Sequence, residues 1–145
     1  MSTFSNLKAT ANERWDRLVS GDRPWIRVGT AMCGQAAGGL KVFECLKAEL
    51  NSQGISAVID KVGCFGMCFA EPLVDITKPG GPRVFFRNIS CEDIPNLIQN
   101  YLLEDKSDSS NAYGYLGDGP VGTIPNLASL PALVMQQRIA LRNAG

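Results

Sequence analysis

The stretch that decides the fold is Val62-Gly-Cys-Phe-Gly-Met-Cys-Phe-Ala-Glu-Pro-Leu-Val74. Two β-type runs flank it: Ile55–Val62 leads into it, and Leu73–Thr77 follows its proline. Between them lies a loop, Gly63–Pro72, that carries cysteines and glycines in place of an apolar helical pattern. The sequence therefore predicts two strands joined by a cysteine loop.

The runs around this stretch complete an α/β pattern. Upstream, apolar residues between Leu40 and Leu50 recur at helical spacing, and this helix is expected to stop at Gln53-Gly54. Downstream, Lys78–Pro82 has turn composition, and Ser90 is expected to cap a helix that runs to about Leu103. The predicted elements are, in order, a helix at 7–20, a strand at 25–28, a helix at 40–50, strands at 55–62, 73–77 and 83–86, and a helix at 90–103.

This order predicts the topology of the sheet. The first two strands bracket a helix and should be parallel, whereas the last two form a hairpin and should be antiparallel. The fold class is therefore α/β, a mixed four-stranded sheet with flanking helices. The layout is close to a minimal thioredoxin fold whose middle helix is replaced by a loop.

Composition changes along the chain predict its division into segments. An N-terminal helix is expected within 1–23 and a thioredoxin-like domain over 24–104. The polar and glycine-rich stretch 105–130 reads as a linker. Helical periodicity returns over 131–145, which predicts a helix that leads into a further domain of a longer chain.

The overall composition excludes several classes of protein. Fourteen Lys and Arg balance 14 Asp and Glu, so the chain shows no sign of a nucleic-acid partner. It has neither an apolar run long enough for a membrane span nor the apolar core of a signal peptide. We therefore expect no direct membrane insertion and a location in the cytoplasm, or on the cytoplasmic face of a membrane-bound complex.

Three of the five cysteines are expected to meet. Cys64 and Cys68 form a C-x3-C loop after one strand, and Cys33 sits where the first strand turns into the first core helix. Because the exits of parallel strands lie at the same end of a sheet, all three thiols should converge at one pole. Thiolates ligate iron, and the glycines around them allow backbone N–H groups to approach the sulfurs. The candidate metal ligands are therefore Cys33, Cys64 and Cys68, and the alternative from spacing alone is that they are buried thiols that only pack.

The other two thiols are weaker candidates. Cys45 lies about 18 Å beyond Cys33 along the helix and is interpreted as a core residue. Cys91 follows Ser90 and is interpreted as a helix-terminus residue that could still lie near the pole. The absence of histidine excludes Cys-His nucleophiles and histidine-ligated zinc, and an odd number of cysteines without a secretion signal argues against a disulfide scaffold.

Four segments of the chain resemble one known domain. Val28–Val42 and Val62–Val74 are similar to the N-terminal thioredoxin-like 2Fe–2S ferredoxin domain of the NADH-binding subunits of complex I relatives, bifurcating hydrogenases and soluble formate dehydrogenases. Pro79–Val84 and Asn88–Pro95 match as well, so the resemblance covers roughly residues 24–103. The ending Gln136–Gly145 also looks like the junction that leads into the flavin-binding domain of those subunits.

The resemblance implies a 2Fe–2S cluster that relays single electrons to or from a flavin site outside this chain. FMN and NAD(H) would bind only in a downstream part, so this chain should not be catalytic alone, and its partners would be other subunits of a multi-subunit NADH-linked oxidoreductase. One position departs from the family pattern, C-x4-C followed by C-x3-C. The first cysteine would fall near Val28. Either Thr30, water or a displaced Cys91 completes the site, or the cluster has been lost.

Three other functions stay open from the residues. A domain without a cluster could serve as a docking module of the same subunit. A thiol–disulfide oxidoreductase is disfavoured because Cys33 is followed by Gly34-Gln-Ala-Ala37, with no resolving thiol. A structural zinc held by three cysteines is the last alternative. Glu71-Pro72 is a candidate cis peptide, because thioredoxin folds commonly place a cis-proline beside their site.

Overall fold

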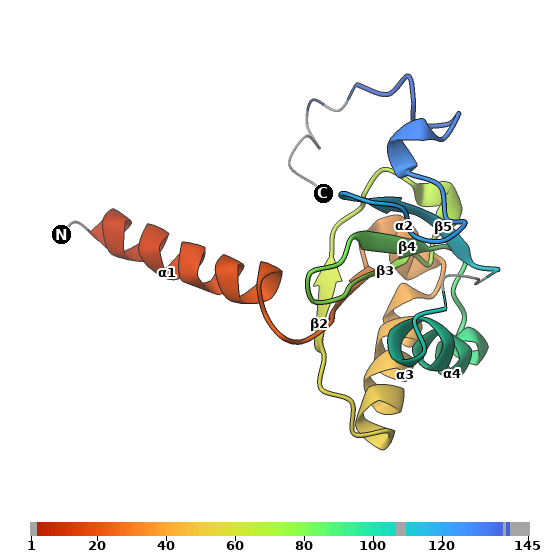
Figure 1. Ribbon diagram of the computed structural model, residues 1–145, viewed down its shortest axis with the longest axis horizontal. Coiled ribbons are helices and arrows are strands. Elements are labelled where there is room, and N and C mark those ends of the chain that lie inside the picture. Colours follow the sequence, from red (N-terminus) through yellow and green to blue (C-terminus); the bar gives the residue numbers. More distant parts are fainter. Residues whose placement is uncertain (1–2, 107–109, 138, 140–145) are drawn as a thin grey trace.

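A computed structural model describes residues 3–106, 110–137 and 139. It contains one five-stranded sheet of order β2-β1-β3-β4-β5, with helices packed on one face (Figure 1). The strands are β1 (Trp25–Gly29), β2 (Val58–Val62), β3 (Val74–Thr77), β4 (Arg83–Phe86) and β5 (Ala112–Leu116). The helices are α1 (Thr3–Val19), α2 (Met32–Ala36), α3 (Gly39–Ser52) and α4 (Ile94–Asn96), the last continued at both ends by helical turns at Cys91–Asp93 and Leu97–Leu103.

The strand pairing confirms the predicted topology. β1 pairs in parallel with β2, in a register that sets Trp25 opposite Val58. β1 pairs antiparallel with β3, and β3 with β4 in the expected hairpin. Ser90 and Asp93 form a capping box at the start of the helical segment that contains α4, which confirms the cap predicted at Ser90.

The main core lies between the sheet and its helices. Alternate strand residues such as Ile26, Val28 and Ile76 face α3 and the α4 segment and are fully buried. From α3, Leu46 and Leu50 pack against them because they recur at helical spacing. Each fully buried side chain of this size contributes about 1.5–3 kcal/mol, so this layer fixes α3 on the sheet.

A second, smaller core lies under the cysteine loop. Phe65 and Met67 of the loop are buried with Leu73 and Phe85, and Leu127 joins them from beyond β5. Phe85 alternates with residues of the main core, so this cluster occupies the opposite face of the sheet. The loop is therefore anchored by its apolar side chains while its cysteines stay near the surface.

Two segment predictions differ from the structure. The predicted linker 105–130 contains β5, which adds a fifth strand to the predicted four. Gly114 permits this close packing, because a Cβ there would lie 2.7 Å from the Leu127 side chain. Residues 131–137 form turns in place of the predicted helix, since Leu133 is drawn into the small core. The rest of the predicted segment 131–145, apart from Ile139, lies outside the described residues.

The N-terminal helix forms as predicted but stands away from the domain (Figure 1). It buries no residue, and its apolar side chains Phe4, Leu7 and Trp15 are exposed. The Trp15 ring makes an edge contact with Trp25, with 6.0 Å between the ring centroids. Among the described helices, none combines the length and the apolar character that crossing a membrane would demand.

Candidate metal centre

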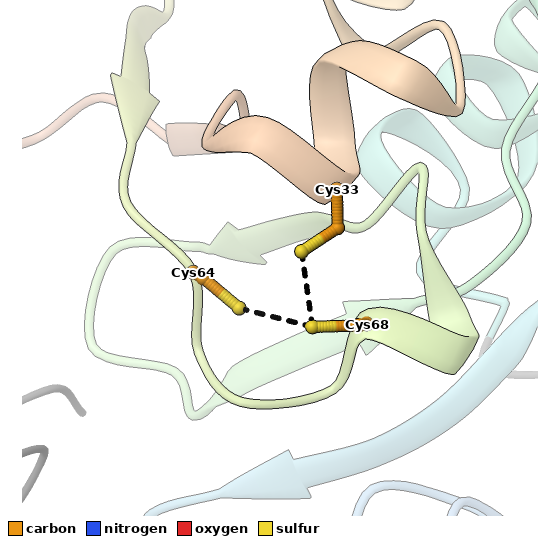
Figure 2. A group of neighbouring side chains, drawn as sticks. All are labelled: Cys33, Cys64 and Cys68. Carbon is orange, nitrogen blue, oxygen red and sulfur yellow. Dashed lines mark hydrogen bonds between the residues drawn. The ribbon is translucent and has the colours of Figure 1, made fainter.

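The three predicted thiols meet at one end of the sheet (Figure 2). Cys33 comes from α2, Cys64 from the loop after β2, and Cys68 from the short helical turn Cys68–Ala70. The Cys33 and Cys68 sulfurs are 3.0 Å apart, and those of Cys64 and Cys68 are 3.6 Å apart. All three sulfurs lie within 4.8 Å of one another, so the predicted convergence is confirmed.

The parallel pair β1–β2 explains why residues so far apart in sequence come together. Both strands run toward the same end of the sheet, where β1 leads into α2 and β2 into the cysteine loop. The two exits are joined, because the Thr30 N–H donates to the Val62 carbonyl at 3.0 Å. On the other side of β1, the Gly29 N–H donates to the Leu73 carbonyl at 2.9 Å.

Close backbone packing sets the position of Cys33. A Cβ on Gly34 would lie 2.3 Å from the Gly29 carbonyl oxygen, so α2 rests directly on the end of β1. Gly38 has φ 99°, a left-handed conformation that glycine adopts without strain, and it turns the chain from α2 into α3. The glycine-rich composition after β1 thus places the Cys33 thiol against the sheet end.

The cysteine loop has its own internal order. Gly66 has φ 90°, and its N–H donates to the Cys64 sulfur at 3.2 Å. This is the kind of backbone donor that stabilises a thiolate. The Glu71–Pro72 peptide that follows is cis, as predicted. Of the aromatic residues in the loop, Phe65 is buried whereas Phe69 is 61% exposed.

The crowding of three thiols has an electrostatic consequence. Hydrogen bonding to Cys33 and then to Cys64 raises the pKa of the Cys68 thiol to about 12. Three thiolates at these distances would repel one another, and a bound cation removes that penalty by displacing the protons. Cys68 is exposed and the other two thiols are partly exposed, so a metal can reach all three. The arrangement therefore suits a metal ion or an iron–sulfur cluster.

Among the residues that the structure describes, Glu71 is a buried carboxylate near this site that forms no ion pair. It is 8% exposed, and one of its oxygens accepts the Leu73 N–H at 2.7 Å. Burial raises the pKa of Glu71, while the Leu73 hydrogen bond opposes the shift. Its carboxylate packs against Gly29 and Gly34, and this contact helps to hold α2 on the end of β1. It does not join the three thiols as a fourth potential ligand.

The remaining cysteines correct the sequence interpretation. Cys45 of α3 and Cys91 form a disulfide with Cα atoms 5.7 Å apart. Cys45 does pack against the main core as predicted, but Cys91 is held on the helical layer and does not lie with the thiol cluster. The bond was missed because 46 residues separate the two cysteines, and only the packing of α3 against the α4 segment brings them together.

The suggested non-cysteine ligands can also be placed. Val28, near which the family pattern expects a cysteine, is fully buried in the main core. The Thr30 hydroxyl donates to the Val62 carbonyl at 3.4 Å, so it is already engaged. Within the described ranges, no Asp or Glu oxygen lies with the three sulfurs. The chain therefore brings together three of the four ligands that a 2Fe–2S cluster takes.

Comparison with known proteins places the chain in a family. No protein-family model matches the sequence. Over 104 residues the chain is 32% identical to the NADP-reducing hydrogenase subunit HndB of Solidesulfovibrio fructosivorans, which covers 70% of this chain and 82% of that subunit. The chain belongs to the HndB family. It is also 25% identical over 65 residues to a protein named "Ferredoxin, 2Fe-2S" from Clostridium pasteurianum, which covers 43% of this chain and 61% of that ferredoxin.

Solved structures confirm the predicted fold of this HndB relative. The thioredoxin-like [2Fe-2S] ferredoxin of Aquifex aeolicus superimposes with a TM-score of 0.57 at 16% identity, over 72% of this chain and all of that one. The Cys55Ser variant of that ferredoxin matches with a TM-score of 0.54 at 16% identity, over 61% of this chain and 96% of the other. The thioredoxin-like ferredoxin fold expected from the resemblance is therefore correct.

Proposed function

We propose that this HndB relative is an electron-transfer module that relays electrons through a 2Fe–2S cluster held by Cys33, Cys64 and Cys68. The observation that carries the proposal is the convergence of these three sulfurs within 4.8 Å, from two separate segments of the chain. The similarity of this chain to a hydrogenase subunit and to a 2Fe–2S ferredoxin supports the same function.

The residues around the thiols have defined tasks in this proposal. The cluster supplies one-electron redox chemistry. Cys33, Cys64 and Cys68 bind it as thiolates, and the Gly66 N–H adds a donor to the Cys64 sulfur. Phe65 and Met67 lie beneath the loop and keep water away from that side of the thiols. Cys68 and Phe69 are exposed, so electrons can enter or leave on that side.

We further propose that the chain works inside a larger assembly. HndB is named as a subunit of an NADP-reducing hydrogenase, which supports a role here as a subunit of a multi-subunit NAD(P)H-linked oxidoreductase. Gly117, Gly119 and Gly122 follow β5 at the glycine spacing of a dinucleotide fingerprint, but no α-helix follows them among the described residues, as that fingerprint requires. The flavin site that exchanges electrons with this domain would therefore lie elsewhere. The predicted domain over 24–104 is kept in this proposal only at its N-terminal boundary, because β5 pairs with β4 and Leu127 joins the small core beyond residue 104.

The test is anaerobic reconstitution of the full chain with iron and sulfide. We expect about two irons and two sulfides per chain, visible charge-transfer absorption, and an S = 1/2 EPR signal after dithionite reduction. Cys33→Ser, Cys64→Ser and Cys68→Ser should each lower cluster occupancy severely. Cys45→Ser/Cys91→Ser is the control, because it removes two cysteines outside the thiol cluster and leaves no new free thiol. Its cluster occupancy is compared at a temperature where denaturation shows the variant to be fully folded.

Three outcomes would contradict the proposal. A folded chain that takes up no iron would leave the docking module as the better reading. Uptake of zinc in place of the cluster, at one ion per chain, would indicate a structural metal site. Reduction of insulin disulfides by the metal-free chain would favour a thiol–disulfide oxidoreductase.

A further inference from the structure

A second thiol lies close to Cys33 although its own helix supplies none. The residues that follow Cys33 in α2 include no cysteine. The fold instead brings Cys68 to it from 35 positions along the chain, and the Cys33 thiol donates a hydrogen bond to the Cys68 sulfur at 3.0 Å (Figure 2). Because a disulfide bond is about 2.05 Å long, the two sulfurs need to approach by only about 1 Å to bond.

Cys64 is the poorer partner for the same thiol. Its sulfur lies 3.6 Å from that of Cys68 and already accepts the Gly66 N–H at 3.2 Å. The loop between these two cysteines is anchored, because Phe65 and Met67 are buried in the small core. A bond within the loop would require it to move against these contacts, so oxidation should select the pair that includes the α2 cysteine.

Reagents in solution have access to the selected pair. Cys68 is exposed and Cys33 is partly exposed. The side chains next to them in sequence do not cover them from solvent by turning inward, since Met32 is 87% exposed and Phe69 is 61% exposed. A small disulfide in solution can therefore reach this pair of thiols.

We propose that the cluster-free chain forms a reversible disulfide between Cys33 and Cys68 by exchange with a low-molecular-weight disulfide. The bond leaves Cys64 as the one free thiol of the three, and a single thiolate is too few to hold an iron–sulfur cluster. An oxidised chain is thereby kept from loading until it is reduced. This block on loading rests on the proposed function, whereas formation of the bond does not.

The exchange balances in two steps. One of the two protein thiols gives up its proton and attacks the external disulfide, which forms a mixed disulfide and releases one small thiolate that takes up the proton. The other protein thiol then attacks the sulfur of the first. The Cys33–Cys68 bond forms, the mixed disulfide breaks, and the second small thiolate leaves with the second proton. Two protein thiols are thus oxidised by two electrons, and one external disulfide is reduced to two thiols.

The test is a redox titration of the full cluster-free chain in anaerobic mixtures of oxidised and reduced glutathione. Thiols that remain free are trapped with iodoacetamide, and peptide mapping locates the labels. On the group Cys33, Cys64 and Cys68 we expect three labels in the reduced chain and one, on Cys64, in the oxidised chain. The peptides that carry Cys33 and Cys68 should be cross-linked. This mapping on the unsubstituted chain decides the question without any variant.

Single substitutions separate the two candidate pairs. Cys64→Ser should form the bond at the same ratio of oxidised to reduced glutathione as the parent chain. Cys33→Ser is the matched variant, because it leaves only the pair within the loop. It should require a more oxidising mixture, with an exchange equilibrium constant lower by about tenfold or more. Equal equilibrium constants for the two variants would overturn the selection of Cys33.

Binding of Co²⁺ alone measures the effect on metal uptake separately from cluster assembly. Thiolates are the ligands expected at this site and give Co²⁺ a charge-transfer absorption band. The reduced chain should show this band, and the chain oxidised by glutathione should lose it. Reduction with a phosphine should restore the band.

The outcomes distinguish this inference from the proposed function. A reduced chain that takes up no iron and sulfide refutes the function and leaves the disulfide standing. Three alkylated thiols in oxidising glutathione, or a Cys64–Cys68 cross-link, refute the disulfide whatever the reduced chain binds. An oxidised chain that binds Co²⁺ as well as the reduced chain does refutes the block on loading.

Discussion

Gly34 shows at the scale of one residue how tightly the thiol site is built. An added Cβ would meet the Gly29 carbonyl oxygen at 2.3 Å, and neither backbone segment can yield easily. We expect Gly34→Ala to lower the free energy of unfolding by about 1–3 kcal/mol, as overpacking does, and to reduce cluster occupancy because α2 carries Cys33.

Gly63 provides the matched control for that substitution. It lies next to Cys64, and a Cβ there would meet nothing within 4 Å. Gly63→Ala should therefore leave the free energy of unfolding within about 0.5 kcal/mol of the parent chain. Urea denaturation measures both variants, and equal losses at the two positions would contradict the close packing of α2 on β1.

Glu71 gives the stability a predictable dependence on pH. Burial raises its pKa above the ordinary 4.5 in the folded state, so the folded protein binds this proton more tightly than the unfolded chain does. The ionised carboxylate then costs stability at neutral pH, and this cost disappears as the pH falls through the raised pKa toward 4.5.

The substitution Glu71→Gln tests that linkage. The glutamine oxygen can still accept the Leu73 N–H, but the buried charge is gone. On the cluster-free chain we expect the variant to be the more stable form at pH 7, with the difference shrinking as the pH is lowered to 4.5. A difference that grows on acidification would show that the carboxylate stabilises the fold as an anion.

At the scale of elements, the disulfide joins α3 to the start of the α4 segment. It closes a loop of 46 residues, and a cross-link over such a loop typically contributes about 2–4 kcal/mol by restricting the unfolded chain. Reduction, or Cys91→Ser, should lower the free energy of unfolding by that amount in denaturation experiments.

The double variant Cys45→Ser/Cys91→Ser is the control for the disulfide. It should lose about as much stability as Cys91→Ser alone, because either change removes the same bond. Parent protein that is equally stable with and without a reducing agent would contradict a structural role for this bond.

Most elements were predictable because their patterns are local. Strand β4 (Arg83–Phe86) has the predicted bounds, and helix α3 (Gly39–Ser52) begins and ends within two residues of the predicted 40–50. Strand β5 was not predicted, because glycines are typical of flexible linkers. The sequence does not show that Gly114 packs closely against Leu127 in a strand that pairs with β4. The convergence of Cys33 with Cys64 followed from one topological rule for parallel strands. No comparable rule predicts the Cys45–Cys91 disulfide, because its cysteines lie on two separate helical segments.

At the scale of the whole molecule, α1 is an appendage. It buries no residue, and the contact of Trp15 with Trp25 is its one aromatic contact among the described residues. Removal of residues 1–21 should therefore lower the free energy of unfolding by no more than about 1.5 kcal/mol, the upper value for an aromatic pair. A larger loss in chemical denaturation would mean that α1 is part of the folded domain.

The central claim is that three thiolates of this chain bind a 2Fe–2S cluster, and Mössbauer spectroscopy of protein reconstituted with iron-57 tests it most directly. Three protein thiolates on two irons give one iron two of them and the other iron one. We therefore expect two distinct quadrupole doublets in the oxidised protein, and one localised ferrous site after reduction. A chain that retains no iron, or a spectrum without sulfide-bridged iron, would contradict the account.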